Sequence, residues 1–144
     1  MPPAVEIVPV RSADQMALAY AIRRRVFIEE QGVPAELELD QDDLSALHVL
    51  AVADGQSIGC ARMMLRPDGA KIGRMAVLAD RRGRGVGRAV LLHLLTAARQ
   101  YGAKRAYLHA QIAVEGFYLK SGFQPVGKVF DEAGIPHRKM ILPL

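Results

Sequence analysis

The chain has 144 residues, of which 51% are hydrophobic and 24% are charged. This length and composition predict one globular domain, spanning residues 1–144, and exclude a disordered or fibrous protein. The formal net charge is +4, and the single cysteine, Cys60, excludes an internal disulfide and a cysteine-based zinc site. No stretch approaches the ~20 apolar residues that cross a bilayer, and the N-terminus lacks the pattern of a secretion signal. The simplest interpretation is a cytoplasmic protein with no membrane, metal or nucleic-acid partner.

The first part of the chain predicts a strand and a long helix. Residues 5–10 are apolar enough for a strand, and Ser12 followed by Gln15 is a capping-box pattern that begins a helix. The helix runs toward Gln31 and ends before Gly32. Within it, residues 23–25 are arginines expected on the polar face. The acidic stretch that follows, residues 36–43, is expected to be a solvated loop that could attract a cationic amine.

The remaining chain alternates between strand and helix patterns. Three strands joined by tight turns are predicted at residues 48–53, 57–65 and 71–78. The later elements are a helix, a strand, a short helix and two closing strands, at residues 86–101, 105–111, 113–121, 123–130 and 137–142. Together they predict an α/β (mixed α+β) domain with a mixed sheet flanked by helices.

A glycine- and arginine-rich turn precedes the long helix. It reads Arg82-Gly83-Arg84-Gly85-Val86-Gly87-Arg88. Glycines let backbone amides approach a ligand, and the helix behind them offers free N–H groups and a positive dipole end. The turn therefore predicts a pyrophosphate cradle whose arginines neutralise the ligand.

The spacing of the glycines excludes two common nucleotide loops. A dinucleotide loop needs a third glycine where Arg88 or Val90 stands, and a P-loop needs Gly-Lys-Ser/Thr where Gly87-Arg88-Ala89 stands. The turn instead resembles the phosphate loop of the GNAT superfamily of N-acetyltransferases, Arg/Gln-x-x-Gly-x-Gly/Ala, with Arg82, Gly85 and Gly87 in the matching positions.

Other segments strengthen this resemblance. Residues 113–123 look like the family's later motif, in which an aromatic-Tyr pair, here Phe117-Tyr118, precedes a Gly-Phe pair. Residues 23–43 and the ending at residues 129–137 are similar to the ElaA-like and YjcF-like bacterial subgroup. The resemblance implies a GNAT fold, with a mostly antiparallel sheet splayed between its fourth and fifth strands, here residues 71–78 and 105–111.

The resemblance also implies how acetyl-CoA binds and reacts. Its pantetheine arm would lie in the splay along Met75, Ala76 and Val77. Its diphosphate would lie on the turn, at Arg82, Gly83, Arg84, Gly85, Val86, Gly87 and Arg88. A primary amine would attack the thioester directly in a ternary complex, and the phenol of Tyr118, which stays protonated at neutral pH, would protonate the leaving thiolate.

The group that takes the proton of the amine is left open. Many family members carry a glutamate on the strand that here reads residues 72–77, where no carboxylate occurs. His137 is the first candidate, because imidazole titrates near neutrality and related members with a Pro-His ending place a histidine near the acceptor. Glu30 is the second candidate and a chain of waters is the third. His48 and His109 are expected to be ordinary packed or edge histidines.

Three alternative functions compete with catalysis of acetyl transfer to an amine. A non-catalytic acyl-CoA-binding regulatory module is disfavoured by Tyr118. A nucleic-acid-binding domain is disfavoured because no base-reading motif occurs. Acyl-homoserine-lactone synthases share a similar early Arg-x-x-Val-Phe stretch but are longer chains. The acceptor stays open among small amines, amino acids, aminated antibiotics and protein lysines, and the resemblance allows a homodimer formed through the C-terminal strands.

Overall fold

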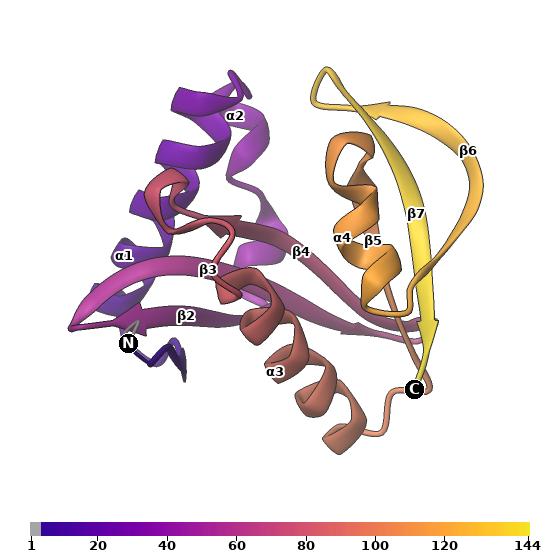
Figure 1. Cartoon of the computed structure of the whole chain (residues 1–144), viewed down its shortest axis with the longest axis horizontal. Helices are drawn as coiled ribbons and strands as arrows, with labels where there is room; N and C mark the ends of the chain where they lie inside the picture. The colour runs from indigo at the N-terminus through magenta and orange to yellow at the C-terminus, as the bar shows by residue number, and fades with distance from the viewer. Residues whose placement is uncertain (1–3) are drawn as a thin grey trace.

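The computed structural model describes residues 4–144. They form a seven-stranded sheet in the order β1-β2-β3-β4-β5-β7-β6, in which only the β4–β5 pair is parallel (Figure 1). The strands are β1 (Glu6–Pro9), β2 (Leu47–Ala53), β3 (Gln56–Arg66), β4 (Gly69–Val77), β5 (Arg105–Gln111), β6 (Gln124–Glu132) and β7 (Ile135–Pro143). The helices are α1 (Ala13–Arg23), η1 (Arg24–Glu30), α2 (Ala35–Glu38), η2 (Gln41–Leu44), η3 (Ala79–Arg81), α3 (Val86–Gln100), η4 (Ile112–Val114) and α4 (Glu115–Lys120). The predicted mixed, mostly antiparallel sheet flanked by helices is confirmed.

Two helices cover opposite faces of the sheet (Figure 1). The apolar stripe of α3, which includes Val90, Leu91 and Leu94, is buried against one face of β2, β3, β4 and β5. On the other face, Ala19 and Ile22 of α1 pack against inward-facing residues of β2, β3 and β4. Each fully buried leucine or isoleucine stabilises the fold by about 1.5–3 kcal/mol. The two apolar layers therefore pack on both faces of the sheet, and the boundary between β4 and β5 is where a site can form.

The first helix departs from regular α geometry in its second half. The Ser12 hydroxyl accepts a hydrogen bond from the backbone N–H of Gln15 at 3.1 Å, as the capping pattern predicts. From Arg24 the chain continues as the π-helix η1, and Gly32, with a φ of +73°, follows it. The predicted extent of the helix was right, but the wider winding of η1 was not expected.

The sheet splays between β4 and β5. Their ladder joins only three residue pairs, Ala70↔Ala106, Lys71↔Tyr107 and Ile72↔Leu108, and beyond Ile72 the two strands no longer pair. On the other edge of β4, a bulge places Arg74 and Met75 opposite a single residue of β3. Arg74 has a φ of +48°, which is strained for a side chain with a Cβ. The bulge bends β4 away from β5, and the predicted splay is confirmed.

The acidic stretch is not a solvated loop, and that expectation was wrong. Glu38 and Asp43 are only 3% and 8% exposed, because arginines from α1, β3 and β4 converge on them. Asp43 accepts hydrogen bonds from Arg23 at 2.7 Å and from Arg62 at 2.8 Å. We call the six charged residues the arginine–carboxylate network: Arg23, Arg62, Arg74, Glu38, Asp40 and Asp43. Its three guanidinium groups balance its three carboxylates.

Arg23 also lies where it was not expected. It is 1% exposed rather than on the polar face of the helix, whereas Arg24 and Arg25 are exposed as predicted. The network also fixes the bulge, because Arg74 donates to the carboxylate of Asp40 and to the backbone oxygen of Glu38, each at 3.1 Å. The strained residue of β4 is thus held by charge contacts to the preceding segment.

Cys60 is a packed thiol. It is 1% exposed in β3, and burial raises the pKa of its thiol to about 12. Within residues 4–144, no helix combines the length and the apolar character needed to cross a bilayer.

Candidate active site

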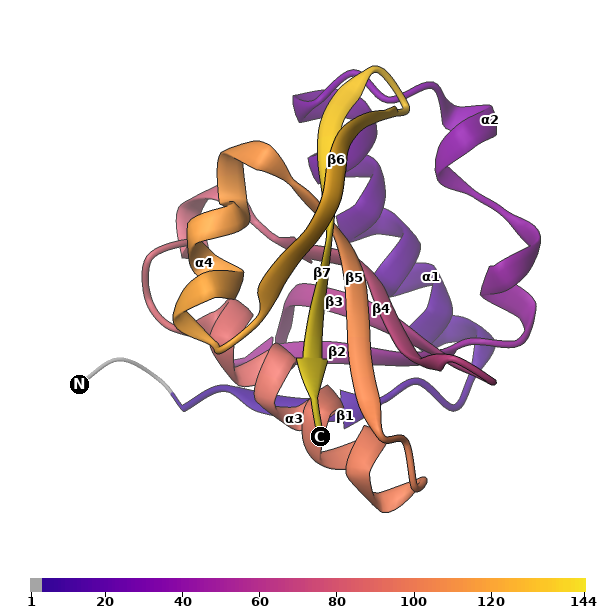
Figure 2. The same cartoon turned by 90° about the vertical axis from the view of Figure 1, so that its right-hand side faces the viewer.

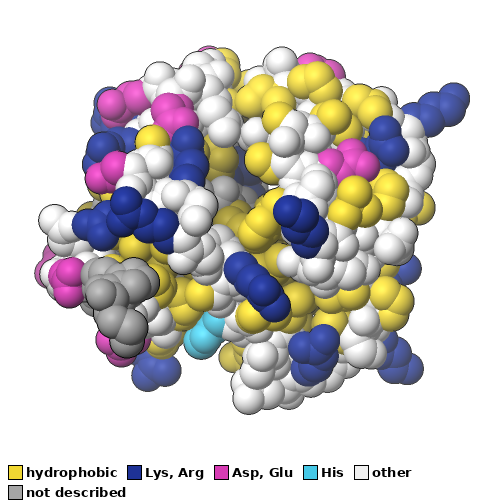
Figure 3. Space-filling model, in the orientation of Figure 1, with side chains coloured by type: hydrophobic (Ala, Val, Ile, Leu, Met, Phe, Trp, Pro, Cys, Tyr) yellow, Lys and Arg dark blue, Asp and Glu magenta, His cyan; other side chains and the backbone are white. Residues whose placement is uncertain are grey.

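A cavity of about 850 Å³ opens where β4 and β5 separate. Its walls come from η1 and the residues after it, the α2–η2 segment, β3, β4, the turn before α3, β5, α4 and the β6–β7 hairpin. Figure 3 shows the surface hollowed at its middle, between the half that carries α1 and α2 and the half that carries α4 and β6. In the view turned by 90°, β7 and β5 lie side by side, with α4 on one side of them and α1 on the other (Figure 2). The cavity therefore follows the splay of the sheet.

The glycine-rich turn forms one end of this cavity. Gly83 and Gly85 have φ values of +75° and +85°, and a Cβ added at either position would meet no atom within 4 Å. Gly85 is the N-cap residue of α3 and has no side chain that could accept hydrogen bonds from the first N–H groups of the helix. Val86 and Gly87 line the cavity beside them. The turn thus presents bare amides and a positive helix end to open space.

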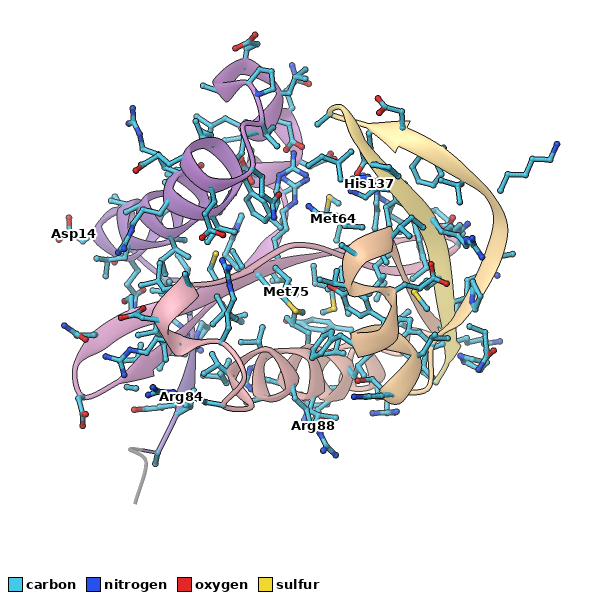
Figure 4. All side chains as sticks on the ribbon, turned by 45° about the horizontal axis from the view of Figure 1, so that its top comes forward. Asp14, Met64, Met75, Arg84, Arg88 and His137 are labelled. Atoms are coloured by element: carbon cyan, nitrogen blue, oxygen red, sulfur yellow. The ribbon has the colours of Figure 1, made fainter. Side chains whose placement is uncertain are left out.

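The arginines of the turn lie in different positions. All three side chains are exposed, but Arg82 and Arg88 line the cavity, whereas Arg84 does not. In Figure 4, Arg84 and Arg88 lie at the N-terminal end of α3, and His137 lies at the far side of the splay. Met75 lies between the two arginines on one side and His137 on the other. The three predicted residues of β4, Met75, Ala76 and Val77, also line the cavity.

Glu30 is paired with an arginine and lies outside the cavity lining. Arg82 donates to its two carboxylate oxygens at 2.9 and 2.8 Å, and also donates to the backbone oxygen of Val77 at 2.9 Å. The hydrogen bonds from Arg82 lower the pKa of Glu30. A carboxylate held in this way is a weaker base, so the contact argues against Glu30 as the group that deprotonates an amine.

Tyr118 stands on α4 beside the middle of the splay. Its ring makes edge-to-face contacts with Phe117 and Phe123, with centroids 5.0 and 5.9 Å away. Its hydroxyl points at the sulfur of Met75, at 3.9 Å, which is a weak acceptor. Burial raises the pKa of this phenol to about 12. The group is therefore a proton donor across the neutral range, with its hydroxyl facing β4.

His137 belongs to a cluster that the sequence did not reveal. Its Nδ1 lies 2.7 Å from the backbone oxygen of Ile135, and its Nε2 lies 3.6 Å from the carboxylate of Glu132. The other oxygen of Glu132 lies 3.0 Å from Nδ1 of His109. Phe130 packs against both imidazoles, with its centroid 5.0 Å from that of His109 and 6.1 Å from that of His137. We call His109, Glu132 and His137 the His–Glu–His cluster; all three line the cavity.

The hydrogen bonds of this cluster assign its protons. A backbone oxygen and a carboxylate only accept, so Nδ1 carries the proton in both imidazoles. Nε2 of His109 is then left with a lone pair, while Glu132 orients the ring. Hydrogen bonding from His109 lowers the pKa of Glu132, which keeps that carboxylate ionised. The cluster can therefore accept one proton and stabilise it with a fixed negative charge.

The sequence did not predict several of these cavity residues. His109 was expected to be an ordinary strand histidine, but it faces the cavity because β5 alternates its side chains between core and cavity. Gln111, two residues further, lies on the same face and donates to the side chain of Gln31, the residue that follows η1, at 2.9 Å. The alternation of apolar and polar residues in β5 was visible in the sequence and could have indicated both positions. No local sequence pattern indicated Glu132. His48 contacts the backbone oxygen of Asp43 at 2.9 Å and packs as expected.

Comparison with known proteins identifies the family. A model of the acetyltransferase (GNAT) domain matches residues 8–144. The chain is 33% identical over 138 residues to YjcF of Bacillus subtilis, an uncharacterized N-acetyltransferase, covering 95% of this chain and 99% of YjcF. The crystal structure of Escherichia coli ElaA has a TM-score of 0.86 and 30% identity, covering 96% of this chain and 99% of ElaA. A GNAT family acetyltransferase from Elizabethkingia anophelis, solved with acetyl-CoA bound, shares the fold at 19% identity and a TM-score of 0.77, covering 97% of this chain and 98% of that one.

The chain belongs to the GNAT acetyltransferase family. Its predicted resemblance to YjcF and ElaA within that family is confirmed.

Proposed function

We propose that the protein transfers an acetyl group from acetyl-CoA to a primary amine by direct attack in a ternary complex. The observation that carries this proposal is one cavity whose lining includes the uncapped turn, the phenol of Tyr118 and the His–Glu–His cluster. A diphosphate binder, a proton donor and a proton acceptor are the parts that the reaction needs. Family membership and the acetyl-CoA complex of the Elizabethkingia relative support the choice of co-substrate.

The proposed coenzyme site uses the turn and β4. The diphosphate would accept hydrogen bonds from the first amides of α3, while Arg82 and Arg88 neutralise its charge. Arg84 would contribute only through its charge, since it does not line the cavity. The pantetheine would lie along Met75, Ala76 and Val77, where β4 no longer pairs with β5. A backbone N–H of this unpaired stretch would polarise the thioester carbonyl.

The proposed reaction moves two protons in opposite directions. The neutral amine attacks the thioester carbonyl, and as the C–N bond forms its nitrogen gives one proton to the His–Glu–His cluster, with His137 or His109 as the immediate base and Glu132 as the compensating charge. The C–S bond breaks without a covalent intermediate on the protein. The leaving thiolate takes the proton of Tyr118, which solvent later restores. A thiolate in an apolar cleft is costly, because a free thiol has a pKa of about 8.5.

A non-catalytic acyl-CoA-binding module is the alternative. Such a module would keep the turn but would not need a proton donor and a proton acceptor in the lining of one cavity. The positions of Tyr118 and of the His–Glu–His cluster favour the enzyme. A single domain spanning residues 1–144, a homodimer and a cytoplasmic location stay predictions.

The proposal is tested by following thiol release and acetylated product together. The protein is incubated with acetyl-CoA and a panel of primary amines, with the free thiol measured by a colorimetric reagent and the product by mass spectrometry. Thiol release that depends on an amine, with an equal amount of acetylated amine, is expected. Saturable coenzyme binding without turnover on any amine would support the non-catalytic module instead.

A further inference from the structure

The carboxylates that line the acceptor end of the cavity are all partnered. We define this end as the wall made by the α2–η2 segment, the first half of β4 and the end of β6. Asp40 is paired with Arg62 and Arg74, and Asp42 with Arg66 at 3.3 Å. Glu38 and Asp43 are held by the other members of the arginine–carboxylate network, and Glu132 by two imidazoles. The part of the acidic stretch that lines the cavity therefore presents no free carboxylate to a cationic acceptor.

Lys71 is the exception among the cations of this wall. Arg62 and Arg74 are paired, but the ammonium of Lys71 makes no hydrogen bond or ion pair within residues 4–144. Its neighbours Ala70 and Ile72 face the core with α3, so alternation places Lys71 on the cavity face, opposite Met64 of β3. It is half-buried, and desolvation lowers its pKa. A partly desolvated cation without a partner is costly unless a ligand supplies the anion.

We infer that the acceptor amine carries an anionic group, a carboxylate in its simplest form, and that Lys71 binds this group. The inference rests on the proposed function and names its substrate class. The amine would face the His–Glu–His cluster and the thioester, and the carboxylate would face Lys71. Because each carboxylate that lines this wall already accepts a hydrogen bond or forms an ion pair, a second ammonium on the acceptor would find no free carboxylate there, whereas an acceptor carboxylate would find the ammonium of Lys71.

The distances along β4 fit a small acceptor. Lys71 and Met75 are four residues apart, which is at most about 13 Å at roughly 3.3 Å per residue. The bulge at Arg74 shortens this separation. The side chain of Lys71 spans part of the distance between Lys71 and Met75. The distance that is left suits an amino acid in which few carbons separate the amine from the carboxylate.

The test compares acceptors in matched pairs. Glycine, β-alanine, 4-aminobutyrate and 5-aminopentanoate are each compared with the corresponding carboxamide, which keeps the shape and removes the charge. We expect kcat/KM for the preferred carboxylate to exceed that of its carboxamide by about 10- to 100-fold, as for a charge-assisted contact. Lys71→Met should abolish this preference through KM, leaving the carboxamide rates and acetyl-CoA binding unchanged. Lys71→Arg should retain part of it.

A charge-matched control separates a local contact from the net charge of the protein. Lys128 is exposed on β6 and lies outside the cavity lining, so Lys128→Met should leave the preference intact. Equal rates within every pair, a preference for diamines, or the same loss in both variants would overturn the inference while leaving the acetyltransferase proposal in place. If no amine is acetylated, the proposed function fails. Calorimetry of the same carboxylates with coenzyme A-saturated protein then decides: Lys71-dependent binding supports the anion site, and its absence overturns it.

Discussion

Replacing Tyr118 by phenylalanine tests the proposed proton donor with little disturbance of the fold. The change removes one hydroxyl and keeps the edge-to-face contacts with Phe117 and Phe123. Within residues 4–144 that hydroxyl makes one polar interaction, with the sulfur of Met75 at 3.9 Å, so we expect its removal to lower stability by about 1 kcal/mol or less. The coenzyme should bind as before, because the turn is unchanged.

Turnover of the Tyr118→Phe variant should fall by about 10²- to 10⁴-fold, which is the usual contribution of a positioned general acid. Because burial raises the pKa of the phenol to about 12, the donor is protonated throughout the neutral and mildly alkaline range. The deficit should therefore not depend on pH there. Steady-state thiol release gives kcat, and calorimetry gives the coenzyme Kd. Tyr101→Phe, which removes an exposed phenol at the end of α3, is the matched control. Unchanged turnover, or a loss explained entirely by weaker coenzyme binding, would remove Tyr118 from the mechanism.

Three further predictions concern the buried charges and the cluster. Arg23→Met should lower the free energy of unfolding in urea by about 3–5 kcal/mol, because it removes the buried arginine that pairs with both Glu38 and Asp43. A loss below about 1 kcal/mol would contradict the importance of the network. Contacts with Arg62 lower the pKa of Asp40 to about 2, and those with Arg23 lower that of Asp43 despite its burial, so their stabilisation is present above about pH 4 and is lost as the pH falls toward 2. The thermal unfolding temperature should therefore fall as the pH is lowered from 4 toward 2, and Asp40→Asn should make this fall smaller. An equally steep fall in the variant would refute the assignment. Glu132→Gln should reduce kcat and alter its pH profile without changing coenzyme affinity, whereas an unaltered profile would exclude Glu132 from positioning the base.

The sequence predicted the elements well because their signals are local. Hydrophobic alternation and turn residues placed the strands and the long helix α3 within two residues of their observed ends. The glycine-rich turn was also local, since its seven residues are contiguous and the helix behind it follows from periodicity. The role of Tyr118 came from the resemblance to the family, and the structure adds its position beside Met75.

The features that were missed depend on contacts between distant segments. Arg23 has the same local pattern as Arg24, and only its partners 15 and 20 residues later make burial possible. His109 and Glu132 meet because β7 pairs with both β5 and β6, which brings the end of β6 over the end of β5. The bulge at Arg74 likewise needs carboxylates from the segment preceding β2. Residue propensity and hydrophobic periodicity do not predict these contacts, because strand order and register decide which distant segments meet.

The central claim is that the turn before α3 binds the diphosphate of an acyl-CoA. Calorimetric titration with coenzyme A and with pantetheine, which lacks the diphosphate, tests it directly. We predict saturable binding of coenzyme A, binding of pantetheine weaker by about tenfold or more, and loss of coenzyme A binding in a folded Gly85→Val variant, whose side chain would occupy the open space at a φ of +85°. Absence of heat with coenzyme A, or equal affinity for the two ligands in both proteins, would contradict the account.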